Sequence, residues 1–212
     1  AGKLVGYNFL SGVYSTNETG RKLYLTIDAN VCRVANEALN GRKGTVGVYN
    51  YETGAIICMV SSPNYDPTEP PVVSAEDSSG IYMNKLLSSR VVPGSIFKVI
   101  TATAAIETLD DLDNFSYTCT GSRQFGTAPT DKIVCVYPHG TVDFEEAMAV
   151  SCNCAFGELA IRVGPTKLEE YTKKAGLTDS YSVDGIPTAP GTFEFPDADV
   201  TLAWTGIGQP KD

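Results

Sequence analysis

A serine and a lysine stand three residues apart in the segment Ser95-Ile96-Phe97-Lys98, and together they could carry out nucleophilic catalysis. Residues three apart on a helix lie on one face, so the Ser95 hydroxyl could share its proton with the Lys98 amine. Apolar neighbours would lower the pKa of that amine by desolvation, and a helix N-terminus would favour negative charge on the serine oxygen. The alternative is that Ser95 caps a buried helix while Lys98 extends to solvent.

A second polar pair follows in Ser151-Cys152-Asn153, between two segments with helical patterns. In a non-helical link, residues two apart can project to the same side, so a hydroxyl and an amide could face one pocket. Ser151 could then relay a proton, and Asn153 could hydrogen-bond a substrate amide. The same S-x-N pattern at 15–17 and 62–64 precedes Ser95 and is interpreted as turn residues.

Helices must position these side chains. The segment Ser95 to Leu109 follows Pro93-Gly94, and its mixture of apolar and small residues predicts a helix buried on most sides. Three further short helical patterns are Asp143 to Val150, Cys154 to Val163 and Thr166 to Lys174, the last closed by Gly176, and the remainder is loop-like until Ala198 to Thr205.

The N-terminal part reads instead as a small sheet with one helix. Alternation predicts a strand over Lys22 to Ile27, after which Asp28 caps a helix from Ala29 to Leu39. Thr45 to Tyr49 and Ala55 to Val60 are strand-like and joined by a loop of hairpin length. Residues 63–80 are rich in Pro, Ser and acids and predict a surface loop, and residues 119–136 predict a loop or hairpin.

These elements predict a mixed fold of the α/β (α+β) class. We expect an antiparallel sheet flanked by helices, together with a mostly helical subdomain over residues 109–200. The chain has 212 residues, of which 42% are hydrophobic, so one large domain over residues 1–212 can bury a sizeable core.

Composition excludes some classes of function. The net charge is −9 and no basic-aromatic cluster exists to follow a phosphate backbone, so nucleic acid is not expected as a partner. No run of 18 apolar residues could span a bilayer. The six cysteines do not have zinc-finger spacing and the chain has a single histidine, so no metal site is expected. Cys119 and Cys135 could form a disulfide in an oxidising compartment or remain buried free thiols.

Four stretches, in one order, resemble the transpeptidase domain of penicillin-binding proteins. The nucleophile segment of that family is similar to the run from Arg90 to Lys98, with Pro-Gly-Ser leading into S-x-x-K. Its second box is similar to His139-Gly140 followed by residues 144–153. The segments 25–28 and 54–63 resemble the first strands of its sheet. The likeness covers residues 25–209 and is greatest to the monofunctional, class B-like enzymes.

The resemblance implies a role for each residue of the two motifs. Ser95 would be the acylated nucleophile, Lys98 its general base, Ser151 the proton relay and Asn153 a contact to the substrate backbone. Such enzymes acylate the serine with a D-Ala-D-Ala stem peptide of peptidoglycan, pass the acyl group to an amine on a neighbouring strand, and react covalently with β-lactams. They use no cofactor. The implied location is the extracytoplasmic face of a bacterial membrane, with an N-terminal anchor outside this chain and membrane proteins of wall synthesis as further partners.

One departure from the family pattern concerns its third box, K-T/S-G, which lies on a strand opposite the nucleophile. None of the ten lysines is followed by Thr-Gly or Ser-Gly, and Lys43-Gly44-Thr45 is a permuted look-alike upstream of Ser95. Residues 204–209 resemble the family just before its next core helix, which predicts a C-terminally truncated domain without its later strands. Losing one oxyanion donor costs about 10²- to 10³-fold in rate, so weak or absent acylation by the isolated chain is expected.

Two other functions fit parts of the pattern. A serine β-lactamase also uses S-x-x-K, but no E-x-x-L-N follows Ser95 to activate a hydrolytic water. A non-catalytic β-lactam sensor or scaffold domain could retain the fold without turnover. A Ser-His-Asp hydrolase is excluded, because His139 is the sole candidate base and Ser95 is not in a G-x-S-x-G elbow; we expect His139 to stabilise the loop before the second box.

Overall fold

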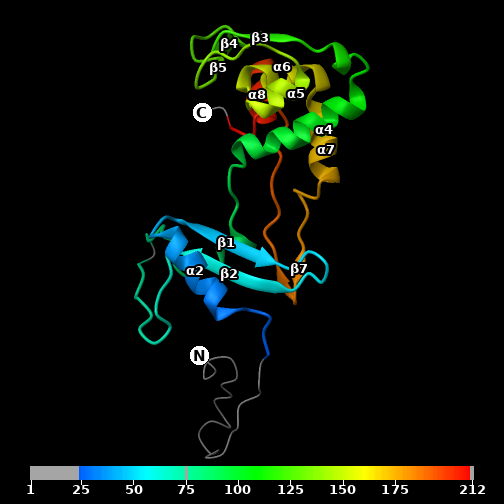
Figure 1. The fold of residues 1–212 in the computed structure, drawn as a ribbon. Helices are drawn as coiled ribbons and strands as arrows, with labels where there is room; N and C mark the ends of the chain where they lie inside the picture. The colour runs from blue at the N-terminus through cyan, green and yellow to red at the C-terminus, as the bar shows by residue number, and fades with distance from the viewer. Residues whose placement is uncertain (1–23, 75, 211–212) are drawn as a thin grey trace, which may run out of the picture. The chain divides into compact units, whose positions relative to one another are not determined.

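The computed structural model describes residues 24–74 and 76–210, and the chain divides into two compact units, Ala1–Ser89 and Arg90–Asp212 (Figure 1). Each unit has its own arrangement of elements and is described by itself. The mixed α/β class expected from the sequence is confirmed: the described residues form helices and short antiparallel pairs of strands. The assignment of residues 1–212 to one domain stays a prediction.

The first unit is built on a hairpin covered by a helix. Strand β1 (Gly44–Tyr49) pairs antiparallel with β2 (Ile56–Ser62), and α2 (Ala29–Leu39) packs against both. Asp28 caps α2 by accepting hydrogen bonds from two N–H groups of its first turn, and Asn40 ends it in the left-handed conformation. These boundaries confirm the predicted helix and hairpin. The unit also contains the short helix α3 (Lys85–Ser88).

The predicted strand from Lys22 to Ile27 is wrong in its described part. Lys22 lies outside the described residues, and residues 24–27 belong to no strand. Next to β2, the hydroxyl of Thr26 donates to the carbonyl of Ile56, and the N–H of Asp28 donates to the carbonyl of Ile57 at 2.8 Å. The Thr26 side chain and the Asp28 N–H therefore bond to the edge of β2, where a paired strand would have formed a ladder of backbone hydrogen bonds. The described residues of the predicted loop at 63–80 contain no helix or strand.

The second unit has a helical core centred on α6 (Asn153–Val163). Seven of its eleven residues are buried, so the helix is covered on nearly all sides. It packs against α4 (Lys98–Thr108) and α8 (Asp199–Gly206), and α7 (Pro165–Lys174) packs against α4 and α6 (Figure 1). The remaining helical elements are η1 (Gly94–Phe97), η2 (Leu112–Asn114) and α5 (Phe144–Ala149).

Two pairs of short strands border this helical core. β3 (Tyr117–Cys119) pairs with β6 (Gly140–Val142), and β4 (Ser122–Gln124) pairs with β5 (Lys132–Val134). A third pair, β7 (Ser182–Val183) with β8 (Ile186–Pro187), lies between α7 and α8 in the chain. The hairpin predicted within residues 119–136 is confirmed as β4 and β5. The pairing of β3 with β6 places Cys119 opposite Gly140. Because Gly140 directly follows His139, this pairing brings Cys119 near His139.

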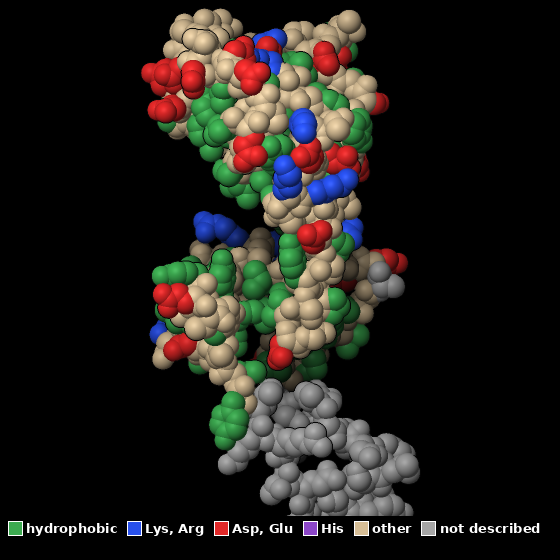
Figure 2. Space-filling model, turned by 90° about the vertical axis from the view of Figure 1, so that its right-hand side faces the viewer, with side chains coloured by type: hydrophobic (Ala, Val, Ile, Leu, Met, Phe, Trp, Pro, Cys, Tyr) green, Lys and Arg blue, Asp and Glu red, His purple; other side chains and the backbone are tan. Residues whose placement is uncertain are grey.

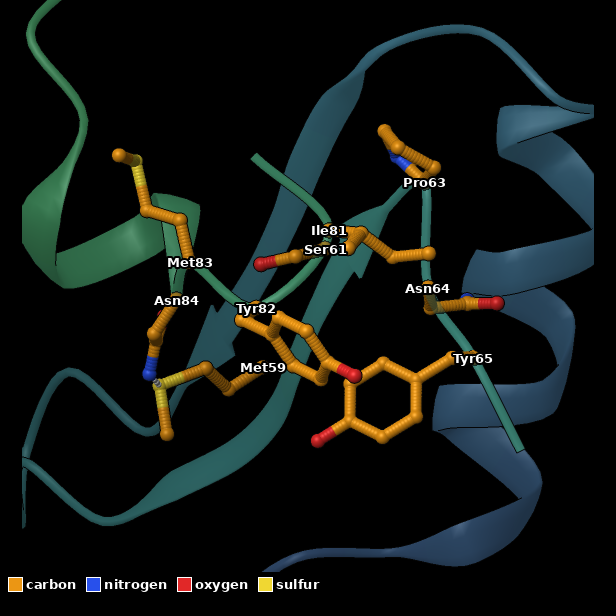
Figure 3. Close-up of a pocket in the computed structure, with 9 residues that line it drawn as sticks. All are labelled: Met59, Ser61, Pro63, Asn64, Tyr65, Ile81, Tyr82, Met83 and Asn84. Atoms are coloured by element: carbon orange, nitrogen blue, oxygen red, sulfur yellow. Dashed lines mark hydrogen bonds between the residues drawn. The ribbon is translucent and has the colours of Figure 1, made fainter. Parts of the chain in front are cut away.

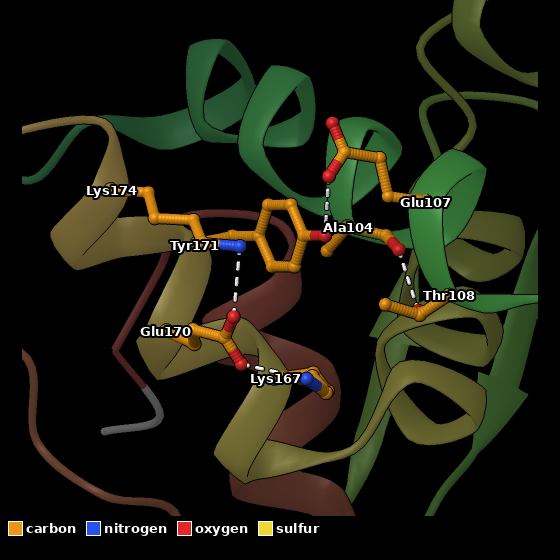
Figure 4. A network of polar contacts seen from close by, with 7 residues as sticks. All are labelled: Ala104, Glu107, Thr108, Lys167, Glu170, Tyr171 and Lys174. Carbon is orange, nitrogen blue, oxygen red and sulfur yellow. Dashed lines mark hydrogen bonds and ion pairs between the residues drawn. The ribbon is translucent and has the colours of Figure 1, made fainter.

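A polar network joins α7 to α4 (Figure 4). The hydroxyl of Tyr171 donates to Glu107 at 2.6 Å, which links the two helices across their packed face. On α7, Glu170 forms ion pairs with Lys167 at 2.7 Å and Lys174 at 2.8 Å. The partners in each pair lie one helical turn apart, so the pairs stabilise α7 locally, while Tyr171 provides the contact to α4.

The surface contains charges of both signs. In the view of Figure 2, acidic and basic side chains are interspersed with apolar ones, and no basic patch is gathered on the face shown. Among the described residues, no helix has the length and apolar character needed to cross a bilayer. Large apolar side chains are exposed in η1 and α4, at Ile96, Val99 and Ile106.

Two glycines at the end of α8 allow it to approach the start of η1 closely. The carbonyl of Gly208 accepts the N–H of Gly94 at 2.8 Å, and the carbonyl of Gly206 accepts the buried hydroxyl of Thr101 at 2.7 Å. A Cβ on Gly208 would lie 2.2 Å from the carbonyl oxygen of Gly94, and the φ of Gly208 is +72°. Position 208 therefore requires glycine for both conformation and space.

We expect Gly208→Ala to lower the free energy of unfolding by about 1–3 kcal/mol, because overpacking against backbone forces η1 and α8 apart. The measurement is thermal and denaturant unfolding of the chain. Gly41→Ala is the matched control, since Gly41 has a φ of +74° but no atom within 4 Å of a built Cβ. Equal losses of unfolding free energy in the two variants would show that the close approach of α8 to η1 contributes nothing to stability.

Candidate active site

Ser95 lies in the tight 3₁₀ turn η1, at the entrance to α4. The sequence predicted one helix from Ser95 to Leu109; the structure places its first turn in 3₁₀ form and its α-helical part at Lys98–Thr108. Gly94 has a φ of +60° and turns the chain into η1. The side chain of Ser95 is exposed, so its hydroxyl is open to a substrate.

Lys98 is a buried lysine whose amine points inward. The residue is only 1% exposed, and its Nζ lies 5.7 Å from the centre of the Phe156 ring. Nζ lies 3.4 Å from Ser95 Oγ, 2.9 Å from Ser151 Oγ and 2.8 Å from the Ser151 carbonyl oxygen. The alternative in which Lys98 extends to solvent is therefore wrong.

Ser151 and Asn153 reach Lys98 from the link between α5 and α6. Asp143 caps α5 with a reciprocal pair of bonds to Glu146, and α5 ends at Ala149. Ser151 then adopts a φ of +52°, which reverses the chain and brings both its hydroxyl and its carbonyl to Nζ. Asn153 begins α6, and its Oδ1 accepts from Nζ at 2.6 Å. All four residues singled out in the sequence thus meet at one amine.

The hydrogen bonds of Asn153 orient the N–H groups and the lone pair of the Lys98 amine. Its Nδ2 donates to the carbonyl of Val134 at 2.9 Å, which leaves Oδ1 as the atom that faces Lys98. Oδ1 and the Ser151 carbonyl can only accept, so a neutral amine would direct its two N–H groups at them. Its lone pair then remains for a hydroxyl, of Ser95 or of Ser151. This is the arrangement that a base acting on serine requires.

Burial sets the protonation of the site. Desolvation lowers the pKa of Lys98 below the ordinary lysine value, while negative charge on Cys135, Cys152 or Cys154 would act in the opposite direction. The desolvation expected from the sequence is present, but it does not come from all of the apolar neighbours of Lys98, because Ile96 and Val99 are exposed while the Phe156 ring lies 5.7 Å from Nζ. The depressed pKa means that the neutral, basic form exists at a lower pH than in a free lysine.

Some contributions to the site could not be predicted from motifs. The carbonyl of Val134 in β5 orients Asn153, and a backbone group has no signature in the sequence. The ring of Phe156 lies one turn further along α6 and helps to exclude water from Nζ. The pair Gly206 and Gly208 is the one signal that could have indicated a close backbone approach at η1.

A separate hollow lies in the first unit (Figure 3). It has a volume of about 260 Å³ and is lined mainly by residues that follow β2 and precede α3. Tyr65 and Tyr82 meet there edge to face, with ring centres 4.8 Å apart. Its lining contains no lysine, histidine, cysteine or carboxylate, so it offers no nucleophile–base pair comparable with that at Ser95.

Residues 44–209 match the family model described as "Penicillin binding protein transpeptidase domain". The chain belongs to this family. The transpeptidase match includes both Ser95-x-x-Lys98 and Ser151-x-Asn153, the two motifs that converge on the Lys98 amine.

Similar proteins include two mycobacterial enzymes named peptidoglycan D,D-transpeptidase PbpA. The chain is 32% identical to that of Mycolicibacterium smegmatis over 64% of the chain and 30% of the relative, and 31% identical to that of Mycobacterium tuberculosis over 79% and 37%. The structure of M. tuberculosis penicillin-binding protein A as a ceftriaxone acyl-enzyme complex superposes with a TM-score of 0.78 at 25% identity, covering 96% of this chain and 49% of that one. The chain thus spans about a third of the length of these curated relatives.

We expect Lys98 to titrate at a lower pH than a free lysine, because its charged form is desolvated. The measurement follows the ¹³Cε chemical shift of Lys98 with pH, assigned by its loss in Lys98→Arg. Because the pKa is lower in the folded than in the unfolded chain, stability linked to Lys98 is lost as the pH falls through the folded pKa. A midpoint at or above that of a lysine model peptide would contradict a basic role.

Asn153→Asp should raise the pKa of Lys98, because a carboxylate would replace the amide oxygen that now lies 2.6 Å from Nζ. The same ¹³Cε titration measures it, and the expected change is a shift of the midpoint to higher pH. Asn114→Asp, which adds the same charge at an exposed position of the same unit, is the matched control. An unchanged midpoint in Asn153→Asp would mean that Asn153 does not act on the amine in solution.

Proposed function

We propose that the protein carrying this chain is a peptidoglycan D,D-transpeptidase in which Ser95 is acylated by a D-Ala-D-Ala stem peptide. The observation that carries the proposal is the buried Lys98 amine, which lies within hydrogen-bonding reach of Ser95, Ser151 and Asn153. Membership of the transpeptidase family and the β-lactam acyl-enzyme structures of similar proteins support it.

The acylation step uses the free lone pair of Lys98. The amine takes the proton of Ser95 Oγ as that oxygen attacks the carbonyl carbon of the penultimate D-Ala. Negative charge develops on the substrate oxygen, and the N–H groups at the start of η1 and α4 are suited to stabilise it. The Ser95–substrate bond forms while the carbonyl bond weakens to a single bond, so no further reactant is needed.

Breakdown of this intermediate requires a proton on the departing D-Ala nitrogen. Ser151 Oγ lies 2.9 Å from Lys98 Nζ and is exposed, so it can pass the proton from the ammonium to the leaving amine. Asn153 uses one N–H for Val134, and the other N–H of Nδ2 can donate to the backbone of the substrate. Acyl transfer to an acceptor amine then reverses the proton path and regenerates Ser95.

β-Lactams would follow the same acylation path, because their strained amide replaces the D-Ala-D-Ala bond. Hydrolysis of the acyl-enzyme, as in a β-lactamase, needs a base that activates water. The hydrogen bonds described for Lys98 go only to serine and asparagine groups, with no carboxylate among them. This favours a long-lived acyl-enzyme, and with it a transpeptidase or a β-lactam sensor over a β-lactamase.

The proposal extends to location and partners. A peptidoglycan substrate places the site on the extracytoplasmic side of a bacterial membrane, with stem peptides and β-lactams as ligands and membrane proteins of wall synthesis as partners. The first unit would then belong to the same transpeptidase domain as the catalytic unit. The similar proteins are named for peptidoglycan transpeptidation, which agrees with this placement.

The decisive measurement is intact mass after incubation with benzylpenicillin. We expect an added mass equal to that of the whole antibiotic, because ring opening on Ser95 loses no atom, and no addition in Ser95→Ala. Ser122→Ala, which removes an exposed hydroxyl from β4 of the same unit, should retain the adduct. The protein as its organism makes it is tested beside the 212-residue chain.

Removal of the base should slow the adduct without changing its mass. Lys98→Ala is expected to lower the acylation rate by about 10²- to 10⁴-fold, the usual contribution of a general base. Turnover of the antibiotic with no accumulating adduct would instead favour a β-lactamase. A folded protein of natural length that forms no adduct would overturn the proposal.

A further inference from the structure

Four side chains of the kind that bind metals converge behind the Ser151–Asn153 link. The ligand atoms of Cys119, Cys135, His139 and Cys152 all lie within 4.8 Å of one another. Cys119 and Cys152 are fully buried, and the other two are partly buried. Each comes from a different place in the fold: the end of β3, the residue after β5, the residue before β6, and the cap of α6.

The distances between sulfur atoms match a shared ion better than a bond. Cys135 Sγ lies 3.7 Å from the sulfur of Cys119 and 3.9 Å from that of Cys152. A disulfide needs about 2.05 Å between its sulfur atoms. Thiolates bound to a tetrahedral zinc ion at about 2.3 Å lie roughly 3.8 Å apart. All six cysteines are free thiols in this structure, which for Cys119 and Cys135 is the second of the two alternatives left open by the sequence.

His139 supplies an observation independent of the sulfur atoms. Its Nδ1 is buried and has no hydrogen-bond partner. A buried polar atom without a partner is costly, and a lone pair on imidazole nitrogen is a preferred ligand for zinc. Tyr137 packs edge to face against the ring at 4.8 Å and helps to hold its plane.

Cys152 connects the cluster to α6. Cys152 is the N-cap of α6, where its Sγ accepts the N–H of Ala155 at 3.5 Å. The link that carries Ser151 and Asn153 therefore contributes one sulfur atom to the cluster.

From these observations we infer that Cys119, Cys135, His139 and Cys152 form a structural binding site for one thiophilic divalent cation of the zinc type. Three thiolates and one neutral imidazole give a closed, tetrahedral ligand set without an open position for water. Because Cys152 stands between Ser151 and Asn153, the ion would fix the link that brings both to Lys98. The ion itself takes no part in the acyl transfer.

Motif spacing could not predict such a site. The ligands are separated by 15, 3 and 12 residues, so only Cys135 and His139 form a pair at zinc-motif spacing, and the second such pair of a zinc motif is missing. The pairing of β3 with β6 and the packing of α6 against β5 are what bring them together. The expectation of no metal site rested on local spacing and on the scarcity of histidine.

The test is a titration of the reduced, metal-free 212-residue chain with Co²⁺, in the absence of oxygen. We expect one equivalent to bind, with thiolate-to-cobalt charge-transfer absorption and the intense visible bands of tetrahedral Co²⁺. One equivalent of Zn²⁺ should then abolish these bands. Native mass spectrometry of the untreated chain should show a single zinc ion, lost on denaturation with a chelator.

Variants identify the ligands. Cys119→Ser and His139→Ala should each lose the tetrahedral spectrum or bind Co²⁺ far more weakly, and zinc should no longer raise their Tm. Cys32→Ser is the matched control, since this cysteine belongs to the first unit and should leave binding unchanged. Circular dichroism of each variant establishes whether it is folded, and the wild-type measurements stand even if a variant is not.

Cys154 provides the sharpest internal comparison, because its Sγ lies 3.6 Å from that of Cys135 and donates to the Ile133 carbonyl at 3.7 Å. Loss of the cobalt spectrum in Cys154→Ser but not in His139→Ala would overturn His139 as the fourth ligand. Failure of the reduced wild-type chain to bind Co²⁺ would overturn the site, as would disulfides in place of metal in the native protein. None of these measurements uses the β-lactam reaction, so the proposed function is tested separately.

Discussion

The second unit depends on how one buried amine is satisfied. Lys98 brings a titratable nitrogen into a core of aromatic and aliphatic side chains, where an unpartnered charge or donor would be strongly unfavourable. Three of its hydrogen bonds come from Ser151 and Asn153, more than 50 residues away in the chain. The fold and the candidate chemistry thus rest on the same contacts: the groups that make burial of the lysine tolerable also direct its lone pair toward serine.

The surrounding architecture holds these contacts in register. α6 carries Asn153 at its first position and Phe156 one turn later, so a single rigid element supplies an acceptor for Nζ and the ring beside it. α8 approaches α6 and η1 through glycine positions where a side chain would collide with its neighbours. Asn153 lies on α6, and both α4 and α8 pack against this helix. Small changes in the packing of α6 would therefore alter the distances between Ser95, Lys98 and Asn153.

The features predicted from sequence are those set by local chemistry. Asp28 and Asp143 are helix caps, and the helices that follow them begin within one residue of their predicted starts. The convergence of Ser95, Lys98, Ser151 and Asn153 was expected from the family resemblance, because their spacing alone left open that Lys98 extends to solvent. The predicted strand at residues 22–27 was wrong in its described part, since alternation cannot reveal that Thr26 and Asp28 bond to the edge of β2 in another way.

Other features depend on contacts between distant segments, which carry no local signal. The Val134 carbonyl that orients Asn153 is a backbone group, and the cysteines around His139 meet only because two strand pairs and one helix cap bring them together. His139, expected from the sequence to stabilise a loop, has a buried Nδ1 without a hydrogen-bond partner and a ring nitrogen within 4.8 Å of three cysteine sulfur atoms.

The 3₁₀ form of η1 has a consequence for the S-x-x-K motif itself. In an α-helix, residues three apart are rotated by about 300°, so their side chains are out of phase by about 60°. A 3₁₀ turn has three residues per turn, and such side chains eclipse one another. The tighter winding from Gly94 to Phe97 therefore points the side chains of Ser95 and Lys98 in nearly the same direction around the helix axis. The three-residue spacing of the motif equals the number of residues in one turn of a 3₁₀ helix. A substitution that relaxed η1 into α-helical winding would rotate the hydroxyl away from the amine while both residues remained in place in the sequence.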